Sequence, residues 1–140
     1  MNVTNDLSIS TDEGGIAIGR TINSDEGTVS LKTGTGDILI GKDITAGKDV
    51  AISTNDGNVV VGDTKTGNDG DILSKTGNVS IRTDKGTVGI VKTVTAEEGS
   101  IEITSGDGDI LIGNNGPDVK TVSAYKIGRA SCRERVYACV

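Results

Sequence analysis

The chain alternates short apolar and polar positions with a spacing that repeats along its length. In GTVSLKTGTGDILIG, residues 27–41, Val29 and Leu31 are two positions apart, and so are Ile38 and Ile40. A period of two interrupted by a polar corner predicts two short strands that meet at a bend. The second apolar pair always begins seven positions after the first pair ends. The other four units are Leu7/Ile9 with Ile16/Ile18, Val50/Ile52 with Val59/Val61, Val79/Ile81 with Val88/Ile90, and Ile101/Ile103 with Ile110/Ile112.

A third apolar position completes each unit. Ile22, Ile44 and Val94 each stand four positions after the second strand of their unit. In the third unit the equivalent residue is Ile72, and the extra residues fall in one loop, Asp63–Asp71. The first strands therefore begin 22, 21, 29 and 22 residues apart. This regularity predicts an all-β fold, a three-sided parallel β-helix (β-solenoid) of about five coils, which makes a rod about 24 Å long at about 4.8 Å a coil.

The corners carry two further regularities. Glycine stands two positions before the first apolar residue of nearly every strand, where a sharp turn needs a residue without a Cβ. Inward-facing hydroxyls follow the first strands, and we expect them to stack and to bond to the backbone of the turns. A preference of threonine for strands and turns is the alternative explanation. The hydroxyl residues are Thr11, Thr33, Thr54, Thr83 and Ser105.

Composition and charge exclude some partners. Aromatic residues make up 1% of the chain, so a core of large side chains is not expected and β-branched residues must fill the interior. The formal net charge is −6, and the lysines are scattered singly, which argues against nucleic acid as a partner. The chain has no apolar run of membrane-spanning length, and MNVTNDLSIS lacks the features of a signal peptide, so we expect no membrane insertion.

Candidate catalytic chemistry is sparse. The chain has no histidine, which removes serine–histidine and cysteine–histidine arrangements and the usual zinc sites. Asp37 with Asp109, or Asp107 with Asp109, are the carboxylate pairs that a glycosidase or lyase would use. Such enzymes also need a groove with long loops and substrate contacts. We therefore expect no enzyme activity, and we assign no catalytic, cofactor-binding or metal-binding residue.

Two segments are similar to the Gly/Asp-rich repeats of calcium-binding RTX proteins. They are TGNDGDIL, residues 66–73, and GDGDILIG, residues 106–113. They do not run in tandem, and Asp109 stands one position before the apolar residue instead of two. Solvated turn residues are the simpler interpretation.

Two surface features have open roles. The loop Asp63–Asp71 is the longest insertion in a unit, and insertions into repeats often decorate one face. An outward line of mostly apolar residues is either a contact surface or a set of ordinary exposed side chains. The line consists of Ala17, Leu39, Val60, Gly89 and Leu111.

The repeat ends before the end of the chain. Residues 127–140 lack the glycine–strand rhythm and contain both cysteines, Cys132 and Cys139. The first ten of them, IGRASCRERV, resemble the conceptual translation of a short-read sequencing adapter. We therefore expect residues 1–126 to be a solenoid segment of a longer protein, and residues 127–140 to be an artefactual tail that adds no coil.

The repeat units GTVSLKTGTGDILIG and GSIEITSGDGDILIG resemble those of filamentous-haemagglutinin-like bacterial surface adhesins of the two-partner secretion type. The resemblance covers residues 3–113. It implies a right-handed β-helix shaft, export by a dedicated partner protein, and an extracellular or cell-surface location. It also implies adhesion to host cells, matrix or other bacteria through regions outside this sequence.

The expected function is a structural shaft or spacer in such an adhesin, with the neighbouring coils of the same longer chain as its partners. An RTX-like calcium-binding secreted protein is the first alternative, and a fragment of a polysaccharide-active β-helix enzyme is the second. Calcium-dependent folding would favour the first alternative, and a loop-walled acidic groove would favour the second.

Overall fold

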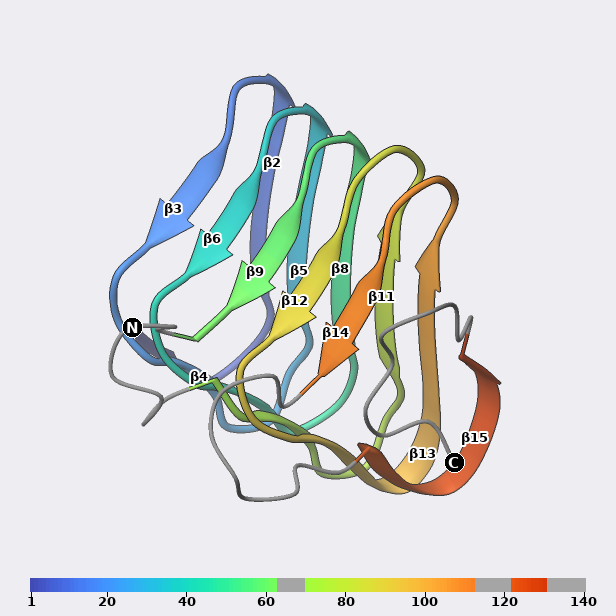
Figure 1. Ribbon diagram of the computed structural model, residues 1–140. Coiled ribbons are helices and arrows are strands. Elements are labelled where there is room, and N and C mark those ends of the chain that lie inside the picture. The colour runs from blue at the N-terminus through green and yellow to red at the C-terminus, as the bar shows by residue number, and fades with distance from the viewer. Residues whose placement is uncertain (63–69, 113–121, 131–140) are drawn as a thin grey trace.

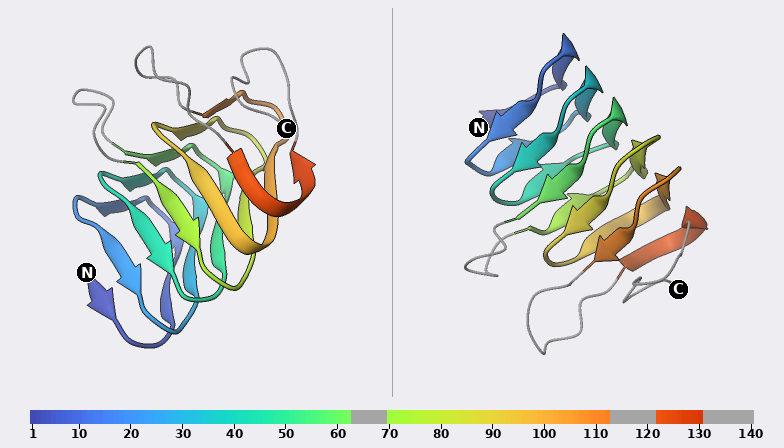
Figure 2. Two further views of the ribbon diagram at one scale, coloured as in Figure 1. Left: turned by 90° about the horizontal axis from the view of Figure 1, so that it is seen from below. Right: turned by 45° about the horizontal axis from the view of Figure 1, so that its top comes forward.

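The computed structural model describes residues 1–62, 70–112 and 122–130, and in these ranges the chain consists of strands joined by bends and short irregular connections (Figure 1). The strands wind into a β-solenoid of about five coils. Two further views show the coils stacked along one axis (Figure 2). The all-β solenoid expected from the apolar spacing is confirmed.

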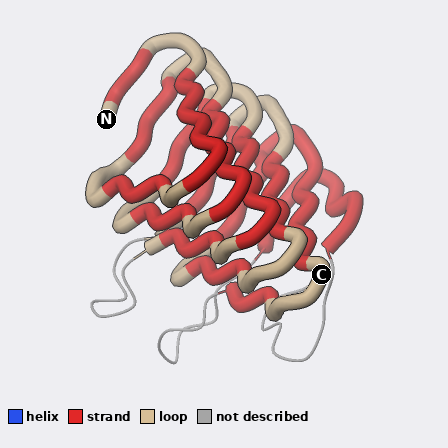
Figure 3. Tube along the Cα trace, turned by 90° about the horizontal axis from the view of Figure 1, so that it is seen from above, coloured by secondary structure: helices blue, strands red, loops and turns tan. Residues whose placement is uncertain are grey.

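Each coil has three faces, separated by corners (Figure 3). The first face contains β2 (Leu7–Glu13), β5 (Val29–Thr35), β8 (Val50–Asp56), β11 (Val79–Thr83) and the end of β13 (Val94–Ser105). The second face contains β3 (Ile16–Ile18), β6 (Ile38–Ile40), β9 (Val59–Val61), β12 (Val88–Ile90) and β14 (Ile110–Ile112). The third face contains β1 (Asn2–Val3), β4 (Ile22–Ser24), β7 (Ile44–Ala46), β10 (Ile72–Ser74), the start of β13, and the start of β15 (Val122–Ala130).

All strand pairs are parallel, and their register matches the repeat in the sequence. The first-face column runs through Leu7, Val29, Val50, Val79 and Ile101. The second-face column runs through Ile16, Ile38, Val59, Val88 and Ile110. The third-face column runs through Ile22, Ile44, Ile72 and Val94. Each column therefore stacks one apolar residue per coil, as the spacing predicts.

These columns form one continuous core. Ile38, Val59 and Val88 are 0% exposed in the second-face column, because a coil covers each of them above and below. The first coil is different, since Leu7, Ile9 and Ile18 are only partly buried against the core. Packing of β-branched side chains between coils thus replaces the large aromatic side chains that the chain lacks.

The third and first faces belong to one sheet because β13 runs around the corner between them. It pairs with β10 through Val94–Ala96 and with β11 through Ile101–Ser105. On its other side β13 pairs with β15, which extends to Ala130. The boundary that we expected between residues 126 and 127 lies inside β15, and the origin of residues 127–140 stays a prediction.

Glycine serves the corners in two ways. Gly14 has a φ of +94°, a conformation that side chains with a Cβ rarely adopt. At Gly86 the limit is space, because a Cβ there would collide with the carbonyl oxygen of Gly57 in the preceding coil. Close stacking of one corner on the next therefore explains why glycine recurs in the sequence.

Candidate functional site

The most regular polar feature is a column of hydroxyls at the first corner, between the first and second faces. Thr54 Oγ1 donates to the Gly36 carbonyl oxygen at 3.0 Å, and Thr83 Oγ1 donates to that of Gly57 at 2.7 Å. Ser105 Oγ makes the same bond to Gly86 at 2.7 Å. In each case the acceptor belongs to the preceding coil. The expectation that these hydroxyls bond to turn backbone is confirmed, and strand preference alone does not explain them.

A second set of hydroxyls, which we did not predict from the sequence, lies between the third and first faces. Ser24 Oγ donates to the Asn5 carbonyl oxygen at 2.6 Å and accepts the Gly27 amide at 3.2 Å. Ser74 Oγ likewise donates to the Lys48 carbonyl oxygen, and it accepts the Gly77 amide at 3.2 Å. Alanines at positions 46 and 96 alternate with these serines in the column, so no unbroken sequence pattern marked it.

Aspartate and asparagine residues that precede the strands form what we call the Asx ladder. Each side-chain oxygen accepts an amide from the following coil. The bonds are Asp6 to the Thr28 amide (2.8 Å), Asp37 to Asn58 (2.8 Å), Asp49 to Asn78 (2.7 Å), Asn58 to Thr87 (2.8 Å) and Asn78 to Ser100 (2.8 Å). We expected these residues to be ordinary solvated turn residues. They are exposed, as expected, and they also cap the backbone between coils, a role that we did not predict from the sequence.

The structure places the two members of one carboxylate pair that we considered for catalysis, Asp37 and Asp109, in different coils. Asp37 directly precedes β6 and Asp109 directly precedes β14 on the second face, and strands β9 and β12 lie between these two strands. Three coil spacings put them about 14 Å apart, beyond the range of about 5–9.5 Å that paired glycosidase carboxylates use. The Asp37 carboxylate is also occupied by the amide and side-chain nitrogens of Asn58, at 2.8 and 3.2 Å. The structure does not bring these two residues together as a catalytic pair.

Acidic residues also lie at the insertion corner, between the second and third faces. Asp43 Oδ1 accepts the amides of Gly70 (2.8 Å) and Asp71 (3.0 Å), at the end of the inserted loop. Asp71 Oδ1 accepts the Thr93 amide (3.2 Å) and its hydroxyl (2.6 Å). Lys92 Nζ is 3.9 Å from the other Asp71 oxygen. Protein donors therefore use the carboxylate of Asp71, the one acidic residue of segment 66–73 that the structure describes.

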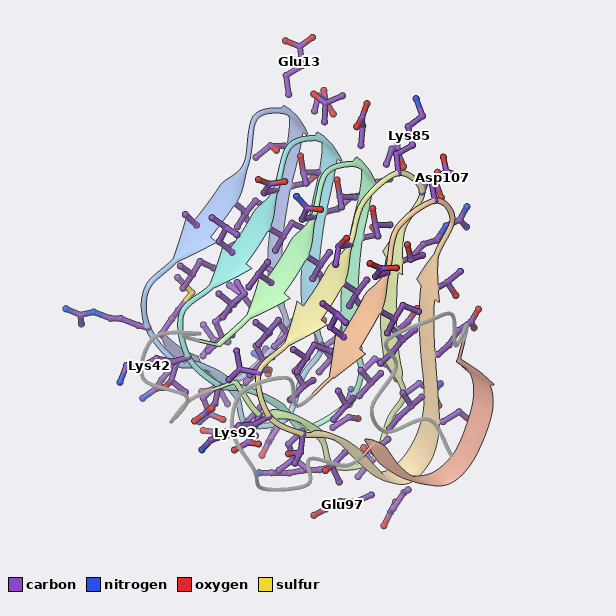
Figure 4. All side chains as sticks on the ribbon, in the orientation of Figure 1. Glu13, Lys42, Lys85, Lys92, Glu97 and Asp107 are labelled. Atoms are coloured by element: carbon purple, nitrogen blue, oxygen red, sulfur yellow. The ribbon has the colours of Figure 1, made fainter. Side chains whose placement is uncertain are left out.

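Residues 63–69 of the loop Asp63–Asp71 lie outside the described residues, as does Gly113 of the second RTX-like segment. Within the described part of the chain, no group of three or more acidic, cysteine or histidine side chains is arranged to hold a metal ion. Charged side chains at the corners point outward instead. Figure 4 labels Glu13, Lys85 and Asp107 at the first corner, and Lys42 and Lys92 near the insertion corner.

A shallow polar depression lies on the outer side of the first face. Its volume is about 280 Å³, and its lining residues are Arg82, Thr83, Asp84, Glu102, Thr104 and Gly106. Arg82 is engaged by Asp84, at 2.9 Å from Nη2 to Oδ1, and both side chains are largely exposed. With its one cation paired and no aromatic side chain in its wall, the depression has little to hold a substrate.

The outward line on the second face is uneven. Leu39 is 43% exposed, whereas Val60 and Leu111 are partly buried and Gly89 has no side chain. In β6, β9 and β12 the line is one residue wide, because each of these strands has three residues and its two flanking residues point inward. It is a narrow stripe, and its role as an interface stays open.

Comparisons with protein-family models, curated proteins and solved structures give no match. In the parts of the chain that the structure describes, we find no helix with the length and apolar character needed to cross a membrane. Function must therefore be argued from the solenoid itself.

Proposed function

We propose that this chain is a structural shaft or spacer segment of a large secreted or cell-surface bacterial adhesin. One observation carries the proposal: the described polar groups at the corners are used mainly to join one coil to the next. Hydroxyls bond to the preceding coil and the Asx ladder bonds to the following coil. Such a structure grows by repetition, and each added coil lengthens it by about 4.8 Å.

The outer surface supports spacing more than binding. The outward residues of the first face are mostly small hydroxyl residues, such as Ser8, Ser30 and Ser80. Binding hot spots are enriched in tryptophan, tyrosine and arginine. The chain has no tryptophan, and Arg82 is already paired with Asp84. This surface favours a segment that positions other regions over one that itself holds a ligand or substrate.

The location follows from the same proposal. A rod of repeated coils that resembles filamentous-haemagglutinin-like repeats suits an extracellular or cell-surface shaft. Ligands on host cells, matrix or bacteria would be bound by regions outside this sequence, and this segment would have no catalytic role. A calcium-folded RTX-like protein remains the alternative, and the calcium dependence of folding separates the two.

Removal of one whole coil tests the spacer role. Deletion of residues 28–48 joins Gly27 to Asp49 and keeps a glycine and an acidic residue before the next strand. We expect a folded protein whose long dimension, measured by small-angle X-ray scattering, is shorter by about 4.8 Å. Unfolding of the deletion variant, or refolding of the intact chain that requires calcium, would contradict the proposal.

Two further measurements address the adhesin context. The intact chain should show no micromolar binding to glycans, matrix proteins or bacterial cells, and such binding would count against a spacer. The genomic sequence around the region encoding residues 1–126 should contain further repeats and a secretion domain. A short gene that encodes a cytoplasmic enzyme at that locus would rule the proposal out.

A further inference from the structure

The two ends of the insertion in the third coil meet at a tightly packed crossing. Gly62 and Gly70 are both buried, and their φ angles are +104° and +125°. A Cβ added to Gly70 would lie 3.0 Å from the Gly62 Cα and 2.9 Å from the Val61 carbonyl oxygen. Position 70 therefore requires glycine both for its backbone conformation and for lack of space. We call Gly62, Gly70 and Asp71 the stem of the insertion.

The coil before the insertion holds the stem through hydrogen bonds. Asp43 Oδ1 accepts the amides of Gly70 and Asp71, at 2.8 and 3.0 Å. At the other end of the insertion, the Gly62 amide donates to the Ile40 carbonyl oxygen at 2.6 Å. The second coil therefore fixes the residue that precedes the inserted residues 63–69 and the two residues that follow them.

The coil after the insertion covers the stem with a residue that breaks the repeat. Val91 directly follows the second strand of its coil, at a position where the three preceding coils have Gly19, Gly41 and Gly62. Val91 is 2% exposed, and a Cβ added to Gly70 would lie 3.0 Å from the Val91 Cβ. Thr93 donates its amide and its hydroxyl to Asp71 Oδ1, at 3.2 and 2.6 Å. The exceptional valine thus lies against the stem.

We propose that the third coil is a display position of the solenoid, at which the coils on either side hold the stem in one arrangement whatever sequence is inserted. The contacts of the stem with Asp43, Val91 and Thr93 are all made by residues outside 63–69. An inserted segment therefore begins and ends at a fixed place on the side of the rod. Repeat proteins carry recognition segments as insertions on such rigid supports.

A packing role alone is the alternative explanation for Val91. If Val91 only filled the interior, its truncation would loosen this corner equally with and without the insertion. If Val91 holds the stem, its truncation matters while Gly62 and Gly70 are separate ends. Removal of residues 63–69 joins these two glycines by a peptide bond, and the valine is then no longer needed to hold them together. The effects of the insertion and of the valine should therefore depend on each other.

Hydrogen exchange of the Gly70 and Asp71 amides in the full 140-residue chain tests the role of Val91. Val91→Ala removes two buried methyl groups and keeps the Cβ, so we expect these amides to exchange at least about tenfold faster. The matched control is the same substitution in a chain that lacks residues 63–69. There the peptide bond closes the corner, and the two exchange rates should change by less than about threefold. Equal acceleration in both chains, or no acceleration in the first, would overturn the proposal.

Replacement of residues 63–69 by a glycine–serine segment of the same length tests whether the stem depends on the inserted sequence. We expect the Gly70 and Asp71 amides to keep their exchange rates within about threefold, because their partners lie outside the replaced segment. Exchange at least about tenfold faster would show that residues 63–69 themselves hold the stem, and would overturn the proposal even if Val91→Ala unfolded the chain. The spacer role makes no claim about the insertion, so it stands or falls on its own tests.

Discussion

The first corner and the insertion corner of each coil follow different rules. At the first corner, every coil uses the same number of residues, and from the second coil onward a hydroxyl bonds to the corner glycine of the coil before it, as Thr54 does to Gly36. At the insertion corner the connection is three residues in the second coil, between Ile40 and Ile44, and longer in the third. One corner has a fixed length and the other tolerates insertion.

The contrast has a physical cause. Thr54 is 2% exposed, so its hydroxyl has little access to water and depends on the Gly36 carbonyl oxygen, and a longer connection there would disturb that bond. At the insertion corner, the ends of the inserted loop meet: a Cβ on Gly70 would be 3.0 Å from the Gly62 Cα. Asp43 then holds the amides of Gly70 and Asp71 where the next strand must start. This corner tolerates the seven additional residues 63–69 because the bonds that close it lie on Gly70 and Asp71, after those residues.

The core shared by both corners should show the largest effect. Ile38→Asp places a carboxylate at a position that is 0% exposed, between Ile16 and Val59. We expect a loss of several kcal/mol and an unfolded chain by circular dichroism, because burial of the charge adds to the roughly 1.5–3 kcal/mol of lost apolar burial. Leu39→Asp is the control. The adjacent Leu39 is 43% exposed, and its variant should melt near the unaltered chain.

The first corner should respond next. Thr54→Val removes the hydroxyl and leaves the Gly36 carbonyl oxygen without its donor. We expect a loss of about 1–3 kcal/mol in the free energy of unfolding, measured in urea. Thr54→Ser keeps the hydroxyl and should recover part of that loss. If valine and serine had equal stability here, the hydroxyl column would not explain the fixed length of this corner.

The sequence predicted the columns because their period is strict and each member is an apolar residue at a fixed offset. It also predicted the hydroxyl column, since Thr33 and Thr54 alternate inward after Leu31 and Ile52. The Asx ladder was missed for a different reason. Aspartate and asparagine suit solvated turns equally well, and the direction of an Asp37 side chain toward the next coil depends on stacking. The hydrogen bonds of Ser24 and Ser74 were not predicted because alanine alternates with serine in their column.

At the insertion corner, Asp43→Ala should have a smaller effect. It removes the acceptor for two backbone amides, but Asp43 and Asp71 are themselves partly exposed, so water can replace part of what the carboxylate supplies. We expect a loss of about 1 kcal/mol, with faster hydrogen exchange at the Gly70 and Asp71 amides. Asp43→Asn retains a side-chain oxygen and should stay closer to the unaltered chain. Protection of those two amides that did not change in Asp43→Ala would show that the carboxylate does not hold the loop end.

Excision of the inserted loop should have the smallest effect. Deletion of residues 63–69 leaves Gly62, Gly70 and Asp71 between Val61 and Ile72, the same length as Gly41, Lys42 and Asp43 in the second coil. Since Gly62 and Gly70 already lie together, the coil can close without moving its strands. Shortening the connection lowers the entropy cost of closure by about 1 kcal/mol, so the stability should change by no more than about that amount.

The matched variant moves the same seven residues to the first corner. Their insertion between Asp56 and Gly57 separates Gly57 from β8. The Gly57 carbonyl oxygen accepts the Thr83 hydroxyl at 2.7 Å, so the insertion disturbs this bond. It also displaces a corner against which Gly86 packs too closely for a Cβ. We expect this insertion to cost at least about 2 kcal/mol more than the excision, since it leaves buried polar groups unpaired. Equal unfolding free energies for the two variants would mean that the corners do not differ, and that chance alone placed the loop where it is.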